Sequence, residues 1–336
     1  VQSRVVINTP GKPDGEQAFW IDGQLRGHWK NINWRTSPTL WANAFTMEAY
    51  VTDRWTKSPV NIIDFDNLVI AETPATDAWA FHGFLLMPYS TFAGMHTGEA
   101  EMFRSHELAH QWFGDLITCK SWEHIWLNEG FATYLESLWL ESRDGYDDGY
   151  LLDVYRNMRS SAEDDRLDPS DEFAWMRPAM VSKVYGHPDD VFRKDANPYP
   201  KGASVLHMLR MRLGDEVYFQ ALQAYVDQYK FDSVETTDFR KMLERVSGLS
   251  LEQFFEQWCY RPGTPELNVA SEWDYERGEL TIHVEQTQRI DAITPAFAFT
   301  LPILIVSENG AQTWTEIDVF KREHERAIPL DDAPSM

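Results

Sequence analysis

The pentapeptide from His106 to His110 reads His-Glu-Leu-Ala-His and places two histidines four positions apart. On a helix, positions i and i+4 stand one turn apart on the same face, so both imidazoles can bind a single ion. Glu129 lies beyond an eighteen-residue spacer and precedes a strongly helical stretch, residues 130–143, which can bring its carboxylate to the first helix. Glu107 lies beside the histidine face, where a carboxylate can take a proton from a metal-bound water without binding the metal. The spacing predicts a zinc site of the kind that hydrolases use.

An accidental His-Glu-x-x-His string is the alternative, and such strings usually lie on solvated helix faces. Here Trp112 and Phe113 are apolar and Gly114 is a helix stop signal, so we expect a largely buried helix that ends at this glycine. Trp122 and Trp126 flank the second helix. We expect the tryptophans at 112, 122 and 126 to lie in the core and not to form a substrate platform.

The composition is that of a folded protein with an acidic excess. Of the 336 residues 43% are hydrophobic, which is enough for a large core and for two or three domains. The 53 acidic and 30 basic residues give a net charge of −23, which repels phosphate backbones and anionic membranes, so we expect no nucleic-acid partner. A dispersed, solvated acidic surface is the favoured interpretation, and steering of a cationic substrate group is the alternative.

Neither the cysteines nor the apolar runs assign a compartment. Cys119 and Cys259 cannot form a disulfide framework and do not have the paired spacing of a structural zinc site. No apolar run approaches the roughly 20 residues that cross a bilayer, and the first residues contain no secretory apolar segment, so we expect a soluble chain without a membrane span. The chain begins with Val1, and we expect a processed or excised piece of a longer protein, for which an extracytoplasmic location is one alternative.

Two regions with different apolar patterns make up the first three quarters of the chain. Residues 1–97 alternate strand signals with turns, and we interpret them as a small α/β lobe. Residues 98–260 are mainly helical and would form the catalytic lobe that contains the zinc site. The strand signals of the first region lie at 5–7, 61–70 and 83–87 with a helix over 40–55, and the helices of the second include 203–213, 216–229, a start at Thr236 and 251–258.

The pattern changes to strands in residues 261–336. Strand signals lie at 279–285 and 297–306, and a polar turn follows at 308–310. A β-sandwich usually needs about 100 residues, so this region predicts a small or truncated one.

Several motifs together resemble one family. The run 106–115 reads HELAHQWFGD, 126–132 reads WLNEGFA, 197–202 reads NPYPKG, and 254–258 reads FFEQW with GTP at 263–265. These motifs closely resemble the M1 family of zinc metallopeptidases, the gluzincins whose best-known members are aminopeptidases. The resemblance extends from about residue 60 to 306.

The resemblance implies a role for each matching residue. His106, His110 and Glu129 would bind one zinc ion, Glu107 would be the general base, and the hydroxyl of Tyr199 would stabilise the oxyanion. It implies hydrolysis of a peptide substrate by a metal-activated water, with aminopeptidase as the default specificity. The alternatives are an endopeptidase or another amide hydrolase, and a noncatalytic binding module that retains zinc. Without the family, Tyr199 is an ordinary loop aromatic.

A zinc-binding imidazole needs an acceptor for its other ring nitrogen, so polar residues near the two helices are candidates for that supporting position. These candidates are Asp115, Asn128, Thr133 and Glu136. Asn128 could equally cap the second helix, and Asp115 could simply end the first.

The sequence departs from the family pattern at the substrate amine. M1 aminopeptidases resemble one another in a Gly-x-Met-Glu-Asn segment whose glutamate binds the free amine, whereas residues 77–87 here read DAWAFHGFLLM. The stretch 78–98 contains no acidic residue. Asp77 and Glu99 are the substitutes that we expect, although neither lies in the family pattern.

A second departure concerns the architecture. The family usually has an all-β domain ahead of the catalytic domain, but the residues before the metal helix fit the small β lobe of a thermolysin-like domain. We therefore expect an α+β fold, in which a thermolysin-like catalytic domain with a small β lobe and a mostly helical lobe precedes the β-sandwich. The cleft would be more open than in the family, or would depend on a missing N-terminal domain or partner.

Overall fold

The computed structural model describes residues 2–6, 9, 11–21, 24–32, 69–73, 78–81, 84–88, 98–167, 170, 176–292 and 294–335. The chain divides into two compact units, Val1–Gln111 and Trp112–Met336, called here the N-terminal and C-terminal units. The expected helix over 40–55 and most of the expected strand over 61–70 lie outside the described residues.

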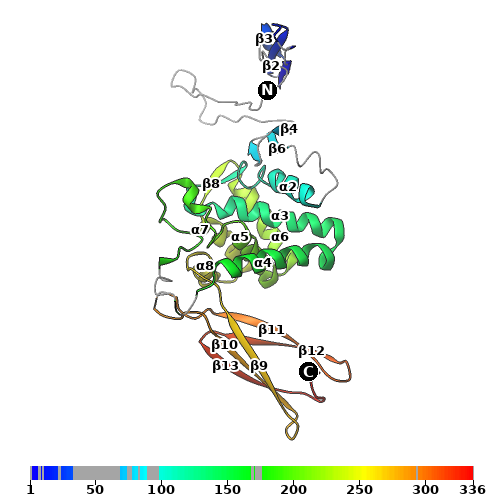
Figure 1. Cartoon of the computed structure of the whole chain (residues 1–336), viewed down its shortest axis with the longest axis vertical. Helices are drawn as coiled ribbons and strands as arrows, with labels where there is room; N and C mark the ends of the chain where they lie inside the picture. The colour runs from blue at the N-terminus through cyan, green and yellow to red at the C-terminus, as the bar shows by residue number, and fades with distance from the viewer. Residues whose placement is uncertain are drawn as a thin grey trace. The chain divides into compact units, whose positions relative to one another are not determined.

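The N-terminal unit contains two small sheets and one described helix (Figure 1). Strands β1 (Gln2–Val6), β2 (Gly15–Ile21) and β3 (Gln24–Ile32) form an antiparallel sheet. In the other sheet, β6 (Phe84–Pro88) pairs in parallel with β4 (Val69–Thr73) and antiparallel with β5 (Trp79–Phe81). Helix α2 (Gly98–Ala109) packs against β5 and β6. The expected strand over 83–87 is thus confirmed.

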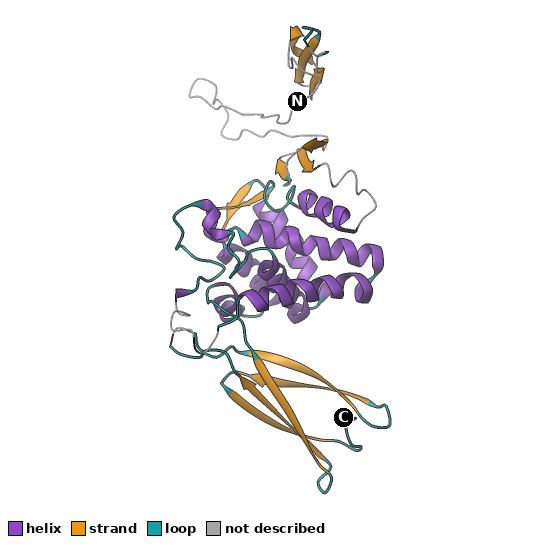
Figure 2. Ribbon diagram, in the orientation of Figure 1, coloured by secondary structure: helices purple, strands orange, loops and turns teal. Residues whose placement is uncertain are grey.

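Helices form the first part of the C-terminal unit, and strands form the second (Figure 2). The helical part comprises η1 (Trp122–His124), α3 (Trp126–Asp144), η2 (Tyr146–Leu151), α4 (Leu152–Asp164), η4 (Pro188–Val191), α5 (Pro200–Leu213), α6 (Asp215–Tyr229), α7 (Thr236–Ser247) and α8 (Glu252–Cys259), with a short parallel pair β7 (Ile117–Cys119) and β8 (Asp232–Val234). Its core contains Trp126, Phe131, Leu206 and Phe239, each fully buried. The expected helices over 203–213, 216–229 and 251–258 and the start at Thr236 are confirmed to within a few residues.

Helices α3 and α5 cross with their backbones in contact. A Cβ added to Gly202 of α5 would lie 2.7 Å from the Cα of Gly130 in α3, and one added to Gly130 would lie 2.8 Å from the Cα of Gly202. Real Cβ atoms are not found this close to backbone atoms, so the crossing requires glycine in both helices. The residue before Gly130 is Glu129, and Tyr199 lies just ahead of α5.

The strand part of the C-terminal unit is a small β-sandwich, as expected. One sheet has the order β13-β10-β9, formed by β9 (Leu267–Asp274), β10 (Glu279–Gln286) and β13 (Glu323–Pro329), and the other pairs β11 (Phe299–Val306) with β12 (Gln312–Val319). Along β10 every second side chain is buried, which is the period-2 pattern of a strand with one face toward a core. Leu280 and Ile282 of β10 pack with Ile305, Ile317 and Ile328 in that core.

Two local expectations were wrong. The helix with the paired histidines ends at Ala109 and not at Gly114, because the chain already turns at His110, where the N–H of Gln111 donates to the carbonyl oxygen of Leu108 at 3.1 Å. Trp126 is fully buried, but Trp112 is 47% and Trp122 is 42% exposed. Both exposed rings lie on turns or a short 3₁₀ segment, where helical periodicity does not direct a side chain inward.

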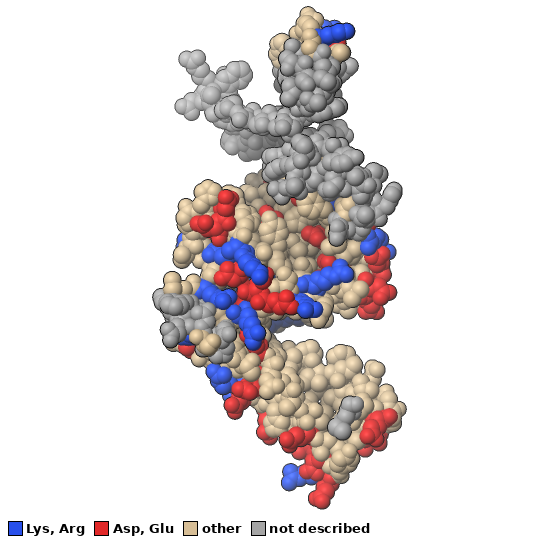
Figure 3. All heavy atoms as spheres, viewed as in Figure 1, with Lys and Arg blue, Asp and Glu red and all other residues tan. Residues whose placement is uncertain are grey.

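Acidic and basic side chains are mixed on the surface of the helical part. Figure 3 shows Asp and Glu side chains interleaved with Lys and Arg over the helical part on the face drawn, without one segregated acidic patch there. Both cysteines are free, and burial raises the pKa of the Cys119 thiol to about 11. Among the described helices, none is both long enough and apolar enough to cross a bilayer.

Candidate metal centre and active site

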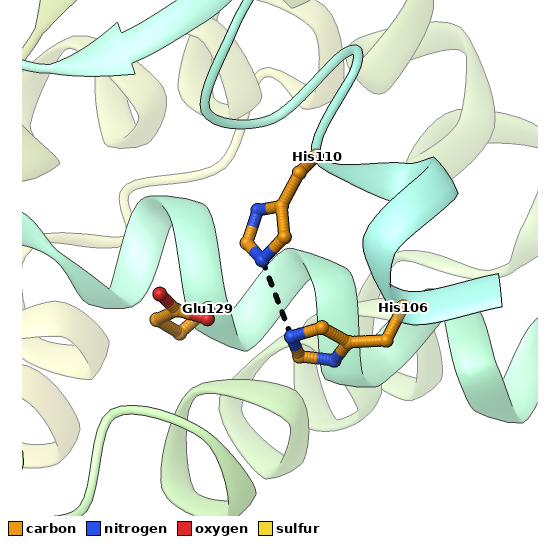
Figure 4. A group of neighbouring side chains, drawn as sticks. All are labelled: His106, His110 and Glu129. Carbon is orange, nitrogen blue, oxygen red and sulfur yellow. Dashed lines mark hydrogen bonds between the residues drawn. The ribbon is translucent and has the colours of Figure 1, made fainter. Parts of the chain in front are cut away.

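The structure brings the three expected zinc ligands together. His106 lies in the last turn of α2, His110 follows the end of that helix, and Glu129 lies in the first turn of α3. One ligand atom from each residue lies within 4.8 Å of the other two. The two Nε2 atoms are 3.2 Å apart, and Figure 4 shows the imidazoles converging through these atoms beside the Glu129 carboxylate.

The donor set fits zinc. Two nitrogens bound to one tetrahedral zinc at about 2.0–2.1 Å lie about 3.3–3.4 Å apart, close to the observed separation of the His106 and His110 nitrogens. The two rings meet edge to face, with an interplanar angle of 80°, so their nitrogens point at a common position without stacking of the rings. Two imidazoles and one carboxylate also leave a fourth tetrahedral position for water or substrate, as catalytic zinc sites do.

Glu107 is adjacent to His106 in α2 and is 7% exposed. Its carboxylate is thus largely removed from solvent, directly after one of the three expected zinc ligands in the helix. Its assignment as general base stays a prediction.

Tyr199 occupies the N-cap position of α5. Its backbone N–H donates to Oδ1 of Asn197 at 3.1 Å, and Pro200 starts the helix with the fixed φ that this position favours. The Tyr199 ring lies 6.0 Å from that of Phe192, which in turn lies 6.2 Å from that of Trp122. The rings of Tyr199, Phe192 and Trp122 therefore form a row that ends at the exposed side chain of Trp122.

The four supporting candidates have different surroundings. Asn128 lies inside α3, where its side-chain oxygen accepts from the N–H of Cys119 at 3.2 Å, and the N-cap of that helix is Ile125. Asn128 thus joins β7 to α3 and does not cap the helix. Thr133 is buried and Glu136 half-buried, four and seven positions after Glu129 on one helix face, and Asp115 is half-buried in the turn after α2. Their support of the ligands stays a prediction.

The candidates for binding the substrate amine stay open. Asp77 lies outside the described residues. Glu99 is in the first turn of α2, about two turns before His106.

Sequence reasoning missed a buried ion pair beside Tyr199. Lys201 and Asp165 are 4% and 3% exposed, and their Nζ and Oδ2 atoms are 2.5 Å apart. Lys201 belongs to the NPYPKG motif and lies just before the helix expected over 203–213, and a lysine is rarely buried without a partner. Nothing in the sequence points to Asp165 as that partner.

A polar cluster around the other end of α5 was also not predicted from the sequence. The Arg210 guanidinium is bound by Glu141 and Asp215 and lies 4.6 Å from the centre of the Tyr150 ring. The Tyr150 hydroxyl hydrogen-bonds to Nδ1 of His207 at 2.8 Å and donates to the Tyr134 hydroxyl at 3.2 Å.

This cluster predicts a pH-dependent loss of stability. Burial, and then the charge of Arg210, lowers the pKa of His207 from 6.5 to about 4. Between these values the unfolded chain binds a proton that the folded chain does not, so the free energy of unfolding falls as pH drops through this range, by about 3 kcal/mol. Replacing His207 with Asn removes this contribution.

Urea unfolding of the wild type and the His207→Asn variant at pH 7 and pH 4.5 measures the effect. The difference between the two proteins cancels other titrating groups, and we expect it to shrink at the lower pH. A difference that is the same at both values contradicts the prediction.

A family model and several curated relatives match this chain. The family model described as "Peptidase family M1 domain" matches residues 80–258, more than half of the chain. Aminopeptidase M1-C of Oryza sativa subsp. japonica is 36% identical over 166 residues, covering 49% of this chain and 18% of the relative. Glutamyl aminopeptidase of Bos taurus is 35% identical over 239 residues, covering 69% of this chain and 23% of the relative.

A solved structure supports the fold. The crystal structure of Legionella pneumophila aminopeptidase A in complex with aspartic acid matches with a TM-score of 0.61 and 20% identity, over 79% of this chain and 30% of that one. The expected mixed fold with a catalytic domain of this type is thereby confirmed. The chain spans less than a quarter of the length of the two curated relatives above. With its family model matched over more than half of its length, the chain belongs to peptidase family M1.

Proposed function

We propose that this chain hydrolyses peptide bonds with one zinc ion and that it acts as an aminopeptidase. The observation that carries the proposal is the convergence of His106, His110 and Glu129, with the buried Glu107 between the two histidines in sequence. The two curated relatives described above are named aminopeptidases, which favours cleavage next to a free N-terminus.

Each residue has a separate task in the proposed reaction. Zinc, when bound by His106, His110 and Glu129, supplies Lewis-acid activation of water and of the scissile carbonyl. Glu107 takes the proton from the attacking water and delivers it to the leaving amine nitrogen. The hydroxyl of Tyr199 donates a hydrogen bond to the oxygen on which negative charge develops.

We divide the chain into three segments and assign the proposed reaction to the first two, which together make up the catalytic domain. In the proposed division, residues 1–97 are the small lobe and 98–260 the helical lobe of the catalytic domain, and residues 261–336 are a separate β domain. Glu99, or Asp77, binds the substrate amine in this proposal in place of the absent family glutamate.

Peptide cleavage with free and blocked N-termini tests the function directly. The purified chain is incubated with pairs of peptides that differ only in N-terminal acetylation, and the products are identified by mass spectrometry. We expect stepwise loss of N-terminal residues from the free peptides only. Cleavage inside acetylated peptides would instead identify an endopeptidase.

Metal removal tests zinc dependence in the same samples. We expect about one zinc per chain by elemental analysis, loss of hydrolysis after chelation, and recovery on adding zinc. Bound zinc without turnover of any peptide would indicate a binding module, and absence of zinc binding would refute the proposed centre.

A further inference from the structure

The segment that bears Tyr199 is held at both ends by one carboxylate. Asp165 is the C-cap residue of α4 and is 3% exposed. Its Oδ1 accepts the backbone N–H of Ala196, and its Oδ2 accepts from Nζ of Lys201 at 2.5 Å. Residues 196–201 thus run from one oxygen of Asp165 to the other, with Tyr199 between the two attachments.

Lys201 connects this segment to a third part of the chain. Its Nζ also donates to the carbonyl oxygen of Gly263 at 3.2 Å, in the junction between the last helix and the first strand of the β-sandwich. Gly263 has a φ of 84°, and an added Cβ would overlap the side chain of Leu167. The ammonium therefore has a carboxylate and a backbone carbonyl as partners in a place that admits little rearrangement.

Stability alone does not account for this arrangement. A buried ion pair gains little over well-packed apolar residues, because removing two charges from water offsets their attraction. Ala196 also adopts a left-handed φ of 53°, which residues with a Cβ disfavour. Such conformations persist where the surroundings hold them and cluster at functional sites.

The helix that follows Tyr199 is also fixed against the helix that bears Glu129. Gly202, the residue after Lys201, touches Gly130, the residue after Glu129, with no space for a Cβ. The backbone positions of Tyr199 and Glu129 are therefore coupled through this crossing. The ion pair fixes Lys201, the residue directly before this crossing.

We propose that Asp165 and Lys201 are positioning residues that hold Tyr199 in the orientation that stabilises the transition state. This inference rests on the proposed function, in which Tyr199 donates to the developing oxyanion. Neither residue contacts the substrate in this proposal, and their effect on the rate passes through Tyr199.

A double-mutant cycle tests the proposal. Asp165→Asn and Lys201→Met are each made alone and together with Tyr199→Phe, and kcat and KM for a cleaved peptide are measured below the melting temperature of every variant. We expect Tyr199→Phe to lower kcat about 100-fold, as loss of an oxyanion donor does. Each ion-pair variant should lower kcat about tenfold or more with KM nearly unchanged, since a small displacement of a catalytic group is costly. In the Tyr199→Phe background these two changes should have almost no further effect on kcat.

Glu141→Gln is the matched control, because it removes a charged partner of Arg210 at the opposite end of α5. Arg210 is 3% exposed and makes two hydrogen bonds to Glu141, at 2.7 and 3.0 Å. We expect this variant to lower the melting temperature while leaving kcat unchanged. Circular dichroism and zinc content verify that each variant is folded and metal-bound.

The outcomes distinguish a failure of the role proposed for Tyr199 from a failure of the positioning proposal. If Tyr199→Phe hydrolyses peptides at the wild-type rate, the assigned role of Tyr199 fails and the positioning proposal fails with it. If Tyr199→Phe is impaired but the ion-pair variants lower kcat by the same factor in both backgrounds, or lower only the melting temperature, the positioning proposal alone is overturned. Should either variant not fold, Lys201→Arg and Asp165→Glu keep the pair with altered length and enter the same cycle.

Discussion

The Glu107→Gln variant should lose about 10²–10⁴-fold of the peptide-hydrolysis rate, as expected for removal of a general base. Glutamine has nearly the same shape but cannot accept the proton of the attacking water. The three proposed zinc ligands are untouched, so zinc content should equal that of the wild type. The measurement is kcat/KM on peptides with free N-termini, together with elemental analysis of the same samples.

Glu101→Gln is the control for this prediction. It makes the same chemical change in the same helix, six positions before Glu107, and we expect its activity to match the wild type. If Glu107→Gln hydrolyses peptides at the wild-type rate with zinc bound, Glu107 is not the base and the proposed mechanism is wrong.

The Gly202→Ala variant should lose about 3 kcal/mol of unfolding free energy, at the upper end of the usual cost of overpacking. Its new Cβ would lie 2.7 Å from the Cα of Gly130, and both atoms belong to the backbones of packed helices. The lower entropy of alanine in the unfolded chain offsets only a minor part of this cost. Urea unfolding followed by circular dichroism measures the change. Hydrolysis by the folded fraction should also fall, because separating α3 from α5 moves Glu129 away from Tyr199.

Gly186→Ala provides the matched control, since a Cβ there would meet only Oδ2 of Asp190, at 3.5 Å. We expect its stability to lie within about 0.5 kcal/mol of the wild type. Gly130→Ala introduces the same conflict from the other helix and should resemble Gly202→Ala. Equal unfolding curves for Gly202→Ala and the wild type would show that the two helices can separate without cost.

The local patterns of the sequence predicted much of the helical part, the β-sandwich and the three residues that converge at the proposed zinc site. Histidines at i and i+4 lie one helical turn apart, and the turn that follows α2 keeps this spacing, since the N–H of His110 donates to the carbonyl oxygen of His106 at 3.3 Å. The strand signal over 279–285 likewise rested on local sequence alone, and the structure contains β10 there with every second side chain buried. Tyr199 came only from the resemblance to the family, because a loop tyrosine has no periodic signature.

The expectations that were wrong depended on tertiary contacts and not on local patterns. Trp112 and Trp122 were expected in the core from their neighbourhood in sequence, but they lie on segments whose direction depends on contacts with distant residues. The end of α2 was placed at the glycine, although the chain already turns at His110. A stop signal limits how far a helix can extend and does not require that it extend so far.

The sequence by itself determined the residues of the proposed centre: two histidines one turn apart, a carboxylate between them and another at the start of the next helix. Only the tertiary structure decided which distant residues lie beside Tyr199 and Glu129. Asp165 pairs with Lys201, which lies 36 positions later in the chain, and the backbone of Gly130 in α3 contacts that of Gly202 in α5. Such contacts depend on how whole elements pack, and a single sequence carries no local periodicity from which they can be read.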